Sequence, residues 1–518
     1  MRELSSVIKS RKKQKMEKVE KVDEVVEPID RISDLPEPII HSILSFLRCP
    51  RDVARVSVWS KKWRSIWTSF FILDFDQKNF GDSGGYHDKK FINAVATRLE
   101  AMDCIQKFKI SLCQPNLKLR THMNRWIGAA IKKHVQELEI HVEAKSRNHY
   151  MLPDAGLSSR KLTSLRLYGC KFNNRMEIDL CNLKELSIKC SQVNADVIHS
   201  FIQSCPLIED LRLVHCKKIG HLNISTLHKL RCLQLYECHG LVSVNIESLS
   251  LVSFIYCGKD PWECKVKVTG CDNLKDLTLK DPDLDEELFQ ELFVKYPNLE
   301  KLVLRECNRL KRLTILNSKL KELSVIRCRN LVEANIDAPN LSVLEYSGGR
   351  MPLSLTHIAG LHEAKLHICY RKNGAVILHE LLDLLRRFEN NGDWKLVVTS
   401  NKNITIHEEL QEIQHLSSNE LRIELIKSPM KVKGYVDNLL RMSKPKTLSL
   451  VSSSSSELLK FLKDKIMSRE NNPKCCTYYS RKCWLHSIKD VTMAVFGRAE
   501  IGTSQSLEQT IFKFDWQS

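Results

Sequence analysis

The sequence predicts an α/β chain: an N-terminal three-helix module, then a long solenoid whose parallel strands line the concave face of a horseshoe or arc. Residues 30–69 contain three short segments with apolar residues at helical spacing. From residue 105 onward the pattern L-x-x-L-x-L recurs, and between Leu162 and Leu361 its copies lie 20 to 25 residues apart. A chain of 518 residues is too long for one ordinary core unless it is built from repeats.

Residues 1–29 are predicted to be a disordered tail, since they contain 8 Lys/Arg and 6 Asp/Glu and little apolar patterning. No apolar run follows the first basic residues, which argues against a secretory signal. The R-K-K-Q-K run at 11–15 is either a nuclear import signal or a solvated part of the tail. We therefore expect the chain in the nucleus and/or the cytoplasm.

Residues 30–75 are predicted to form the three-helix module. The first helix begins at Leu35-Pro36, because a proline in the first turn removes only an N–H that would have no partner there. Pro50 and Ser60 are suited to begin the second and third helices. About forty residues are too few to cover three helices on every side, so some of the apolar surface should contact a partner.

This segment resembles the F-box, the plant type in particular. The resemblance rests on I-S-D-L-P at 32–36, I-L-S-F-L at 43–47 and A-R-x-S-x-x-S-K-K-W-R-x-x-W at 54–67. It implies binding to a Skp-family adaptor, which joins an F-box protein to a cullin–RING ubiquitin ligase. The residues that it marks as adaptor contacts are Leu35, Pro36, Ile39, Ile40, Ile43, Leu44, Leu47, Val53, Val56 and Trp63.

Residues 76–104 are predicted to be a linker that leads into repeats at 105–370. In each copy of L-x-x-L-x-L the last two apolar residues are two apart, so they share one face of a short strand. Stacked strands then bury a core that no single repeat could bury, and the spacing is that of leucine-rich repeats. Cysteine takes the third position after the last apolar residue in seven copies, where we expect small buried side chains at the turn off the strand: Cys113, Cys170, Cys216, Cys238, Cys307, Cys328 and Cys369.

The segments between the strands are of two kinds. Residues 194–204 and 283–295 have helical apolar spacing and precede a proline and the next strand. The stretches 213–230 and 304–320 are too short for a long helix. We expect irregular or 3₁₀ backs there, with lower curvature.

Residues 371–470 are predicted to be irregular repeats, with a helix at 379–389, a strand at 394–399 and a strand–helix pair at 447–466. Residues 471–518 are predicted to be a C-terminal cap that shields the last repeat. Within it, residues 475–496 resemble the end segment of plant F-box/LRR proteins. Whether one body or two follows the F-box is left open around residues 370–400.

The net charge of +18 resides mostly in the long C-terminal body. Either the body attracts an acidic partner, such as a target protein, a phosphorylated segment or a polyphosphate, or Lys and Arg simply solvate a repeat surface. Aromatic residues are not interleaved with a basic stripe, so no nucleic-acid partner is expected. No apolar run reaches the length of a membrane span, so no membrane partner is expected either.

The motifs that could carry chemistry are weak. G-D-S-G-G at 81–85 matches the nucleophile motif of trypsin-like proteases, but only His41 precedes it, and a flexible glycine-rich connector is expected instead. Cys475, Cys476, Cys483 and His486 are too loosely spaced for an assigned zinc site. The nineteen cysteines are expected to be free thiols. We assign no catalytic residue, no metal and no cofactor.

The resemblance implies the substrate-recognition subunit of an SCF-type cullin–RING E3 ubiquitin ligase, with the F-box on a Skp-family adaptor and the repeat arc on an unknown target protein. No residue of this chain would perform chemistry, and the rate would come from proximity. Two alternatives stay open: a scaffold without ligase activity, and a receptor for a small ligand or an inositol polyphosphate. Basic residues on the concave face would favour the receptor; the positions to inspect are Arg166, Arg212, Gln234 and Val303.

Overall fold

The computed structural model describes residues 71–143 (except 83–84, 87 and 114–115), 149–368 (except 174–176, 259–263, 282, 349–351 and 358–359) and 444–516 (except 453–456, 468–483 and 500–506). It also describes 395–400, 420–425, Leu440 and, in the N-terminal module, Leu35, Pro36, Ile39, Ile40 and Ile43. The predictions for residues 1–29, for the helix at 379–389 and for Cys369, Cys475, Cys476 and Cys483 lie outside these residues.

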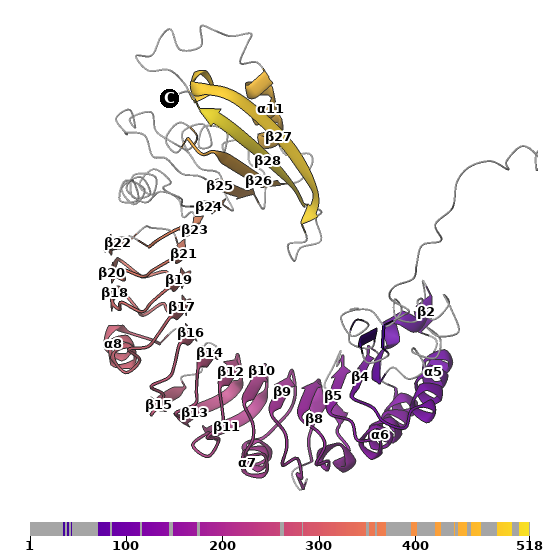
Figure 1. Cartoon of the computed structure of the whole chain (residues 1–518). Coiled ribbons are helices and arrows are strands. Elements are labelled where there is room, and N and C mark those ends of the chain that lie inside the picture. The colour runs from indigo at the N-terminus through magenta and orange to yellow at the C-terminus, as the bar shows by residue number, and fades with distance from the viewer. Residues whose placement is uncertain are drawn as a thin grey trace, which may run out of the picture.

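A long parallel sheet follows the concave side of an arc, as Figure 1 shows. The solenoid predicted from the leucine pattern is thereby confirmed. Each strand pairs in parallel with the next one in this series: β1 (Ile72–Asp76), β4 (Lys107–Leu112), β5 (Glu137–Val142), β7 (Ser164–Tyr168), β9 (Glu185–Lys189), β10 (Asp210–Val214), β12 (Cys232–Tyr236), β14 (Ser253–Cys257), β16 (Asp276–Lys280), β17 (Lys301–Arg305), β19 (Glu322–Ile326), β21 (Val343–Gly348), β23 (Glu363–Ile368), β24 (Lys395–Ser400), β25 (Glu420–Leu425) and β26 (Thr447–Ser452).

The register of this sheet aligns the leucine pattern from repeat to repeat. Leu277 of β16 pairs with Leu302 of β17, which pairs with Leu323 of β19. In β7 the strand leucines Leu165 and Leu167 are buried while Arg166 between them stays accessible. β10, β12 and β19 show the same alternation, whereas the residue between the leucines is buried in β17. The sheet begins at Ile72, before the first copy that the pattern marks at residue 105.

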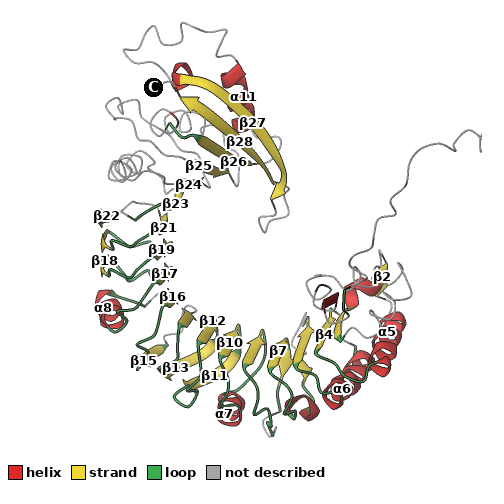
Figure 2. Cartoon of the chain, in the orientation of Figure 1, coloured by secondary structure: helices red, strands yellow, loops and turns green. Residues whose placement is uncertain are grey.

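Within residues 71–368, the helices that the structure describes behind the sheet (Figure 2) are α5 (Asp88–Ala101), α6 (Leu117–Lys132), α7 (Ala195–Ser204) and α8 (Glu286–Val294). Both predicted helices, at 194–204 and 283–295, are present as α7 and α8. Asn116, Asn194 and Asp285 cap α6, α7 and α8, each accepting a hydrogen bond from the backbone N–H three residues on. Two short 3₁₀ turns, η1 (Gln77–Phe80) and η2 (Asp154–Leu157), lie near the first repeats.

The expectation of irregular or 3₁₀ backs in the short repeats is wrong, because strands form them. β11 (Lys217–Asn223), β13 (His239–Glu247) and β15 (Lys265–Thr269) make one parallel back sheet. β18 (Arg312–Leu316), β20 (Glu333–Asp337) and β22 (Leu353–Thr356) make another. R-L-T-I-L and E-A-N-I-D alternate apolar and polar residues with the period of a strand, which selects extended backbone. A further short pair is β6 (Tyr150–Met151) with β8 (Cys170–Lys171).

The glycine-rich segment expected as a flexible connector is instead a hairpin. β2 (Gly81–Asp82) pairs antiparallel with β3 (Gly85–Tyr86). Next to it, the buried side chain of Gln77 accepts a hydrogen bond from the backbone N–H of Cys113 and donates one to Asp88. These contacts attach the turn after β1 to the following repeat.

The cysteines at the strand ends form a ladder of thiols. Cys216, Cys238, Cys307 and Cys328 are buried, as predicted, and each follows a residue with positive φ: His215, Glu237, Glu306 and Arg327. The left-handed residue turns the chain back, so each thiol lies against the carbonyl of the last buried apolar residue in the strand of the preceding repeat. Cys216 Sγ is 3.2 Å from Ile188 O, and Cys238 Sγ is 3.3 Å from Leu213 O. Among the residues that the structure describes, every cysteine is a free thiol.

At the C-terminal end the sheet changes direction. β28 (Leu507–Trp516) pairs antiparallel with β26, and β27 (Ile488–Ala499) pairs antiparallel with β28. α11 (Glu457–Met467) and the 3₁₀ turn η3 (Trp484–Ser487) complete this part, where Leu462 and Phe512 are buried. The strand and strand–helix pair predicted at 394–399 and 447–466 are present as β24, β26 and α11. In the described part of the chain, no helix is long and apolar enough to cross a membrane.

Candidate functional site

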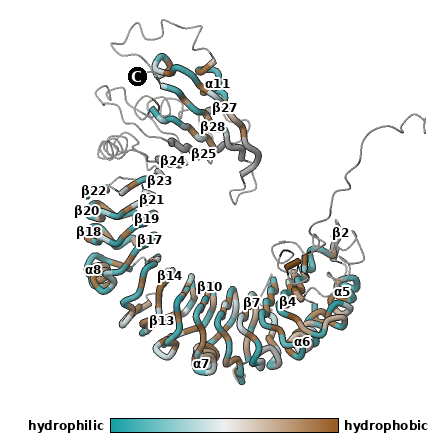
Figure 3. Tube along the Cα trace, viewed as in Figure 1, coloured by the Kyte–Doolittle hydropathy of each residue, from teal (hydrophilic) through white to brown (hydrophobic). Residues whose placement is uncertain are grey.

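The concave face of the front sheet presents side chains at regular intervals from strand to strand. Strand residues that alternate with the buried leucines point to this side, so each strand contributes two or three positions. Figure 3 shows hydrophilic (teal) and hydrophobic (brown) segments alternating along the arc. The position between the two strand leucines is occupied, in order, by Asp74, Lys109, Glu139, Arg166, Ser187, Arg212, Gln234, Ile255, Thr278, Val303, Ser324 and Glu345.

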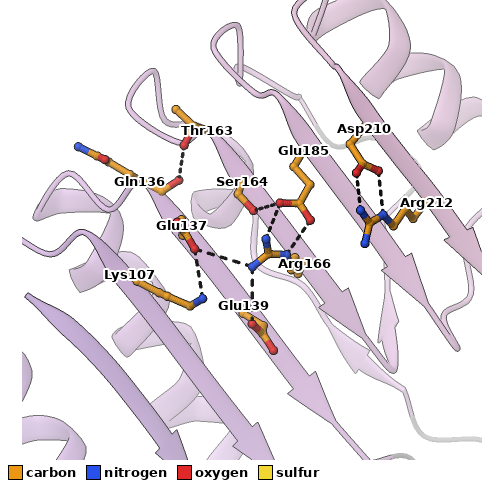
Figure 4. A network of polar contacts seen from close by, with 10 residues as sticks. All are labelled: Lys107, Gln136, Glu137, Glu139, Thr163, Ser164, Arg166, Glu185, Asp210 and Arg212. Carbon is orange, nitrogen blue, oxygen red and sulfur yellow. Dashed lines mark hydrogen bonds and ion pairs between the residues drawn. The ribbon is translucent and has the colours of Figure 1, made fainter. Parts of the chain in front are cut away.

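The first strands carry a connected network of opposite charges (Figure 4). Arg166 forms a bidentate pair with Glu185 of the next strand, with Nε 2.7 Å from Oε1 and Nη2 2.5 Å from Oε2. On its other side, Nη1 of Arg166 lies 3.8 Å from Glu137 and 4.0 Å from Glu139. One guanidinium therefore links three strands, β5, β7 and β9.

The network extends in both directions along the sheet. Lys109 Nζ lies 3.6 Å from Asp74 and 3.6 Å from Glu139. At the far side, Arg212 forms a two-contact pair with Asp210 on its own strand. Positive and negative side chains thus alternate from β1 to β10 and compensate one another.

These pairs bear on the polyphosphate hypothesis. Of the four positions singled out in the sequence, Arg166 and Arg212 already bind carboxylates, Gln234 is neutral and Val303 is buried. A polyphosphate would have to compete with these carboxylates for the guanidinium groups. The described concave surface therefore does not favour that ligand.

The network shifts the pKa values of its members. Burial raises the pKa of Glu185, but the hydrogen bonds and charge of Arg166 outweigh it and hold the pKa below its ordinary value. The hydrogen bonds that Arg166 donates to Glu185 in turn raise the pKa of Arg166. Asp74 behaves in the opposite way, since burial raises its pKa more than Lys109 lowers it.

We expect Glu185→Gln to reduce the acid sensitivity of the fold. A carboxylate with a lowered pKa stabilises the folded state above its ordinary pKa, and this contribution is lost as pH falls through the lowered value. The variant should be less stable than the wild type at pH 7, and the difference should shrink as the pH falls below the ordinary pKa of a glutamate. Urea midpoints across this range test it; a constant difference at every pH would contradict the assignment.

The middle of the concave face is more apolar. Val214, Tyr236, Ile255 and Ile326 are half-buried there. Tyr168 stacks on His141 with ring centroids 4.1 Å apart, on β7 and β5, the strands that also carry the charged network. Tyrosine and arginine side chains surrounded by such surface are typical anchors of protein–protein contacts.

The N-terminal module contributes a second surface. In its first helix Ile39 is 50% exposed and Ile43 is 41% exposed, whereas Ile40 is fully buried. Ile39 and Ile43 are four residues apart, so they share one helical face. Leu35 is half-buried and Pro36 is exposed. The other predicted adaptor contacts, Leu44, Leu47, Val53, Val56 and Trp63, lie outside the described residues.

No metal centre is apparent in what the structure describes, where no group of three or more His, Cys, Asp or Glu side chains is arranged to hold an ion. The zinc hypothesis rests on three cysteines outside those residues, so it stays untested.

Sequence reasoning missed the acidic partners Glu137, Glu139, Glu185 and Asp210. Their signal was available, because each stands at a strand position that faces the same side as Arg166 in its own or a neighbouring repeat.

Comparison with known families finds matches to both segments of the chain that carry these surfaces. The family model for F-box-like domains matches residues 32–71. The model described as At1g61320/AtMIF1, LRR domain, matches residues 101–268 and 262–435, which together are more than half of the chain. The chain belongs to the plant F-box/LRR-repeat family. Proteins of this family are generally non-catalytic adaptors that bind other proteins.

Three F-box relatives from Arabidopsis thaliana show the extent of the likeness. FBD-associated F-box protein At4g13985 is 27% identical over 45% of this chain and 48% of its own length. F-box/FBD/LRR-repeat protein At5g22700 is 32% identical over 36% of this chain and 41% of its own. F-box/LRR-repeat protein At3g03360 is 26% identical over 58% of this chain and 62% of its own. The chain thus matches less than two thirds of each relative.

Proposed function

We propose that this F-box/LRR chain is the substrate-recognition subunit of an SCF-type cullin–RING E3 ubiquitin ligase. Its F-box would bind a Skp-family adaptor, and its repeat arc would bind a target protein, in the nucleus and/or the cytoplasm. The observation that carries the proposal is the pair of exposed isoleucines, Ile39 and Ile43, on a helix inside the segment that matches the F-box-like model. Two such side chains on one helical face suit an apolar docking contact.

The concave face supports the second half of the proposal. It combines Arg166 in a connected charge network with a half-buried stretch around Tyr236 and Ile255. A mixed surface of this kind suits a folded protein, which offers apolar and charged groups together, better than a uniformly charged ligand. Ubiquitin transfer itself would be performed by the other subunits, while this chain raises the local concentration of the target.

The decisive experiment is a pull-down of a Skp-family adaptor with the full chain. We expect Ile39→Asp combined with Ile43→Asp to abolish binding, because two carboxylates would be buried in an apolar contact. The matched control is Leu117→Asp, since Leu117 is 83% exposed on α6, outside the segment that matches the F-box-like model, and should leave binding unchanged.

Each outcome has a clear meaning. Binding by the wild type and the control but not by the double variant supports the ligase role, and proteins that accumulate in cells carrying the double variant become target candidates. A folded wild type that does not bind the adaptor would leave a repeat scaffold without ligase activity.

A further inference from the structure

In the described part of the chain, no strand is paired to the outer edge of β27. β27 is 12 residues long and pairs with β28, and no other described strand pairs with it. In Figure 1 it is the outermost strand of the C-terminal sheet. An open edge presents unpaired backbone N–H and C=O groups, which proteins commonly guard with charges or proline. The central segment of β27, V-T-M-A-V at 491–495, has neither.

One face of β27 is also unusually exposed. Met493 pairs with Phe512 and Val491 with Phe514, and directly opposed residues lie on the same face of a sheet. Phe512 and Phe514 are buried, but Met493 is 50% exposed and Val495 is 54% exposed. The sheet face that is buried at β28 therefore continues onto β27, where its apolar side chains are exposed.

The segment is self-complementary. Val491 and Val495 stand at equal distances on either side of Met493. In an antiparallel pair of two such strands centred on Met493, Val491 would oppose Val495 of the second copy and Thr492 would oppose Ala494. The apolar rows of both strands would then lie on one face, whereas a shift by one residue would place them on opposite faces. The segment 491–495 contains no charged residue, so no like charges would oppose each other within it.

We propose that β27 is a dimerisation strand that pairs antiparallel with β27 of a second copy of this chain, with Met493 on the two-fold axis. The sheet formed by β26, β28 and β27 would continue through the axis into the second copy. Such an interface is isologous and closed, so assembly stops at two copies. One pair of strands buries less area than a standard protein interface, so the dimer should be weak and concentration-dependent.

Sedimentation velocity on the full chain over a range of concentrations tests the proposal. We expect a monomer–dimer equilibrium in the wild type, and at least a tenfold weaker dimer in Met493→Lys, where two ammonium groups would face each other across the axis. Val242→Lys is the matched control, because Val242 is also 50% exposed and lies on β13 in the back sheet. It should dimerise like the wild type.

The proposal is overturned if the wild type stays monomeric at every concentration, even if its β27 pairs with another protein instead. It is also overturned if the dimer persists unchanged in Met493→Lys. The register has its own test with a short bis-maleimide cross-linker. Met493→Cys should gain a cross-linked dimer over the wild type, whereas Val495→Cys should not, since its copies would be roughly 14 Å apart along the strands. Equal gains would refute the register. None of these measurements involves the adaptor, so they stand apart from the proposed ligase role.

Discussion

Replacing Gly169 by alanine is expected to lower the free energy of unfolding by about 3 kcal/mol or more. Gly169 has φ +69°, and a Cβ there would overlap the carbonyl oxygen of Val142 in the neighbouring repeat. The backbone cannot move away freely, because the N–H of Gly169 donates to Lys189 O and its carbonyl accepts from the N–H of Tyr150. Strain and steric overlap therefore act together.

Gly128→Ala is the control for this substitution. Gly128 lies inside α6 and has no heavy atom within 4 Å of a built Cβ. Alanine there should be neutral or should stabilise the chain by up to about 1 kcal/mol through helix propensity. Chemical denaturation of both variants separates the two effects, and equal midpoints for Gly169→Ala and the wild type would contradict the close approach.

Leu302→Ala is expected to cost about 3 kcal/mol, the second large effect. Leu302 is fully buried between Leu277 and Leu323 in the leucine ladder. The repeats on both sides hold the backbone in register, so the cavity cannot close easily. Leu316→Ala is the matched control, since Leu316 is 71% exposed on β18 and should change stability by no more than about 0.5 kcal/mol.

Urea unfolding followed by circular dichroism measures both leucine variants. Repeat arrays can unfold in parts, so the comparison should use the midpoint of the transition that involves the central repeats. A loss of stability in Leu316→Ala as large as that in Leu302→Ala would argue that burial in the ladder is not what stabilises this region.

The front sheet could be predicted from sequence because each repeat has to bury the leucines on one face of its strand. L-x-x-L-x-L places two leucines on one strand face, and neither Leu165 nor Leu167 could be buried without a neighbour that carries the same pattern. The backs were harder to predict. Length excluded a long helix from 304–320, but only the period-two alternation in R-L-T-I-L distinguishes a strand from an irregular turn.

The concave site was predictable only in part. The position between the leucines marked Arg166 and Arg212 correctly as surface residues. Their charges could not be interpreted one strand at a time, because Arg166 obtains its partners Glu137 and Glu185 from the strands on either side. The open edge of β27 was not predictable either, since whether a strand lies at an edge depends on which strands pair with it.

The two kinds of back have a mechanical consequence. Repeats backed by β11, β13 and β15, or by β18, β20 and β22, are hydrogen-bonded to their neighbours through two sheets, whereas the repeat backed by α8 lies between these two blocks and adds no strand to a back sheet. On the convex side α8 contacts β18 through side chains, where Gln290 donates to the carbonyl of Thr314 and Glu286 accepts from the backbone N–H of Arg312. Bending there breaks no strand ladder on the convex side. This part of the arc should therefore flex more easily at α8 than within either block.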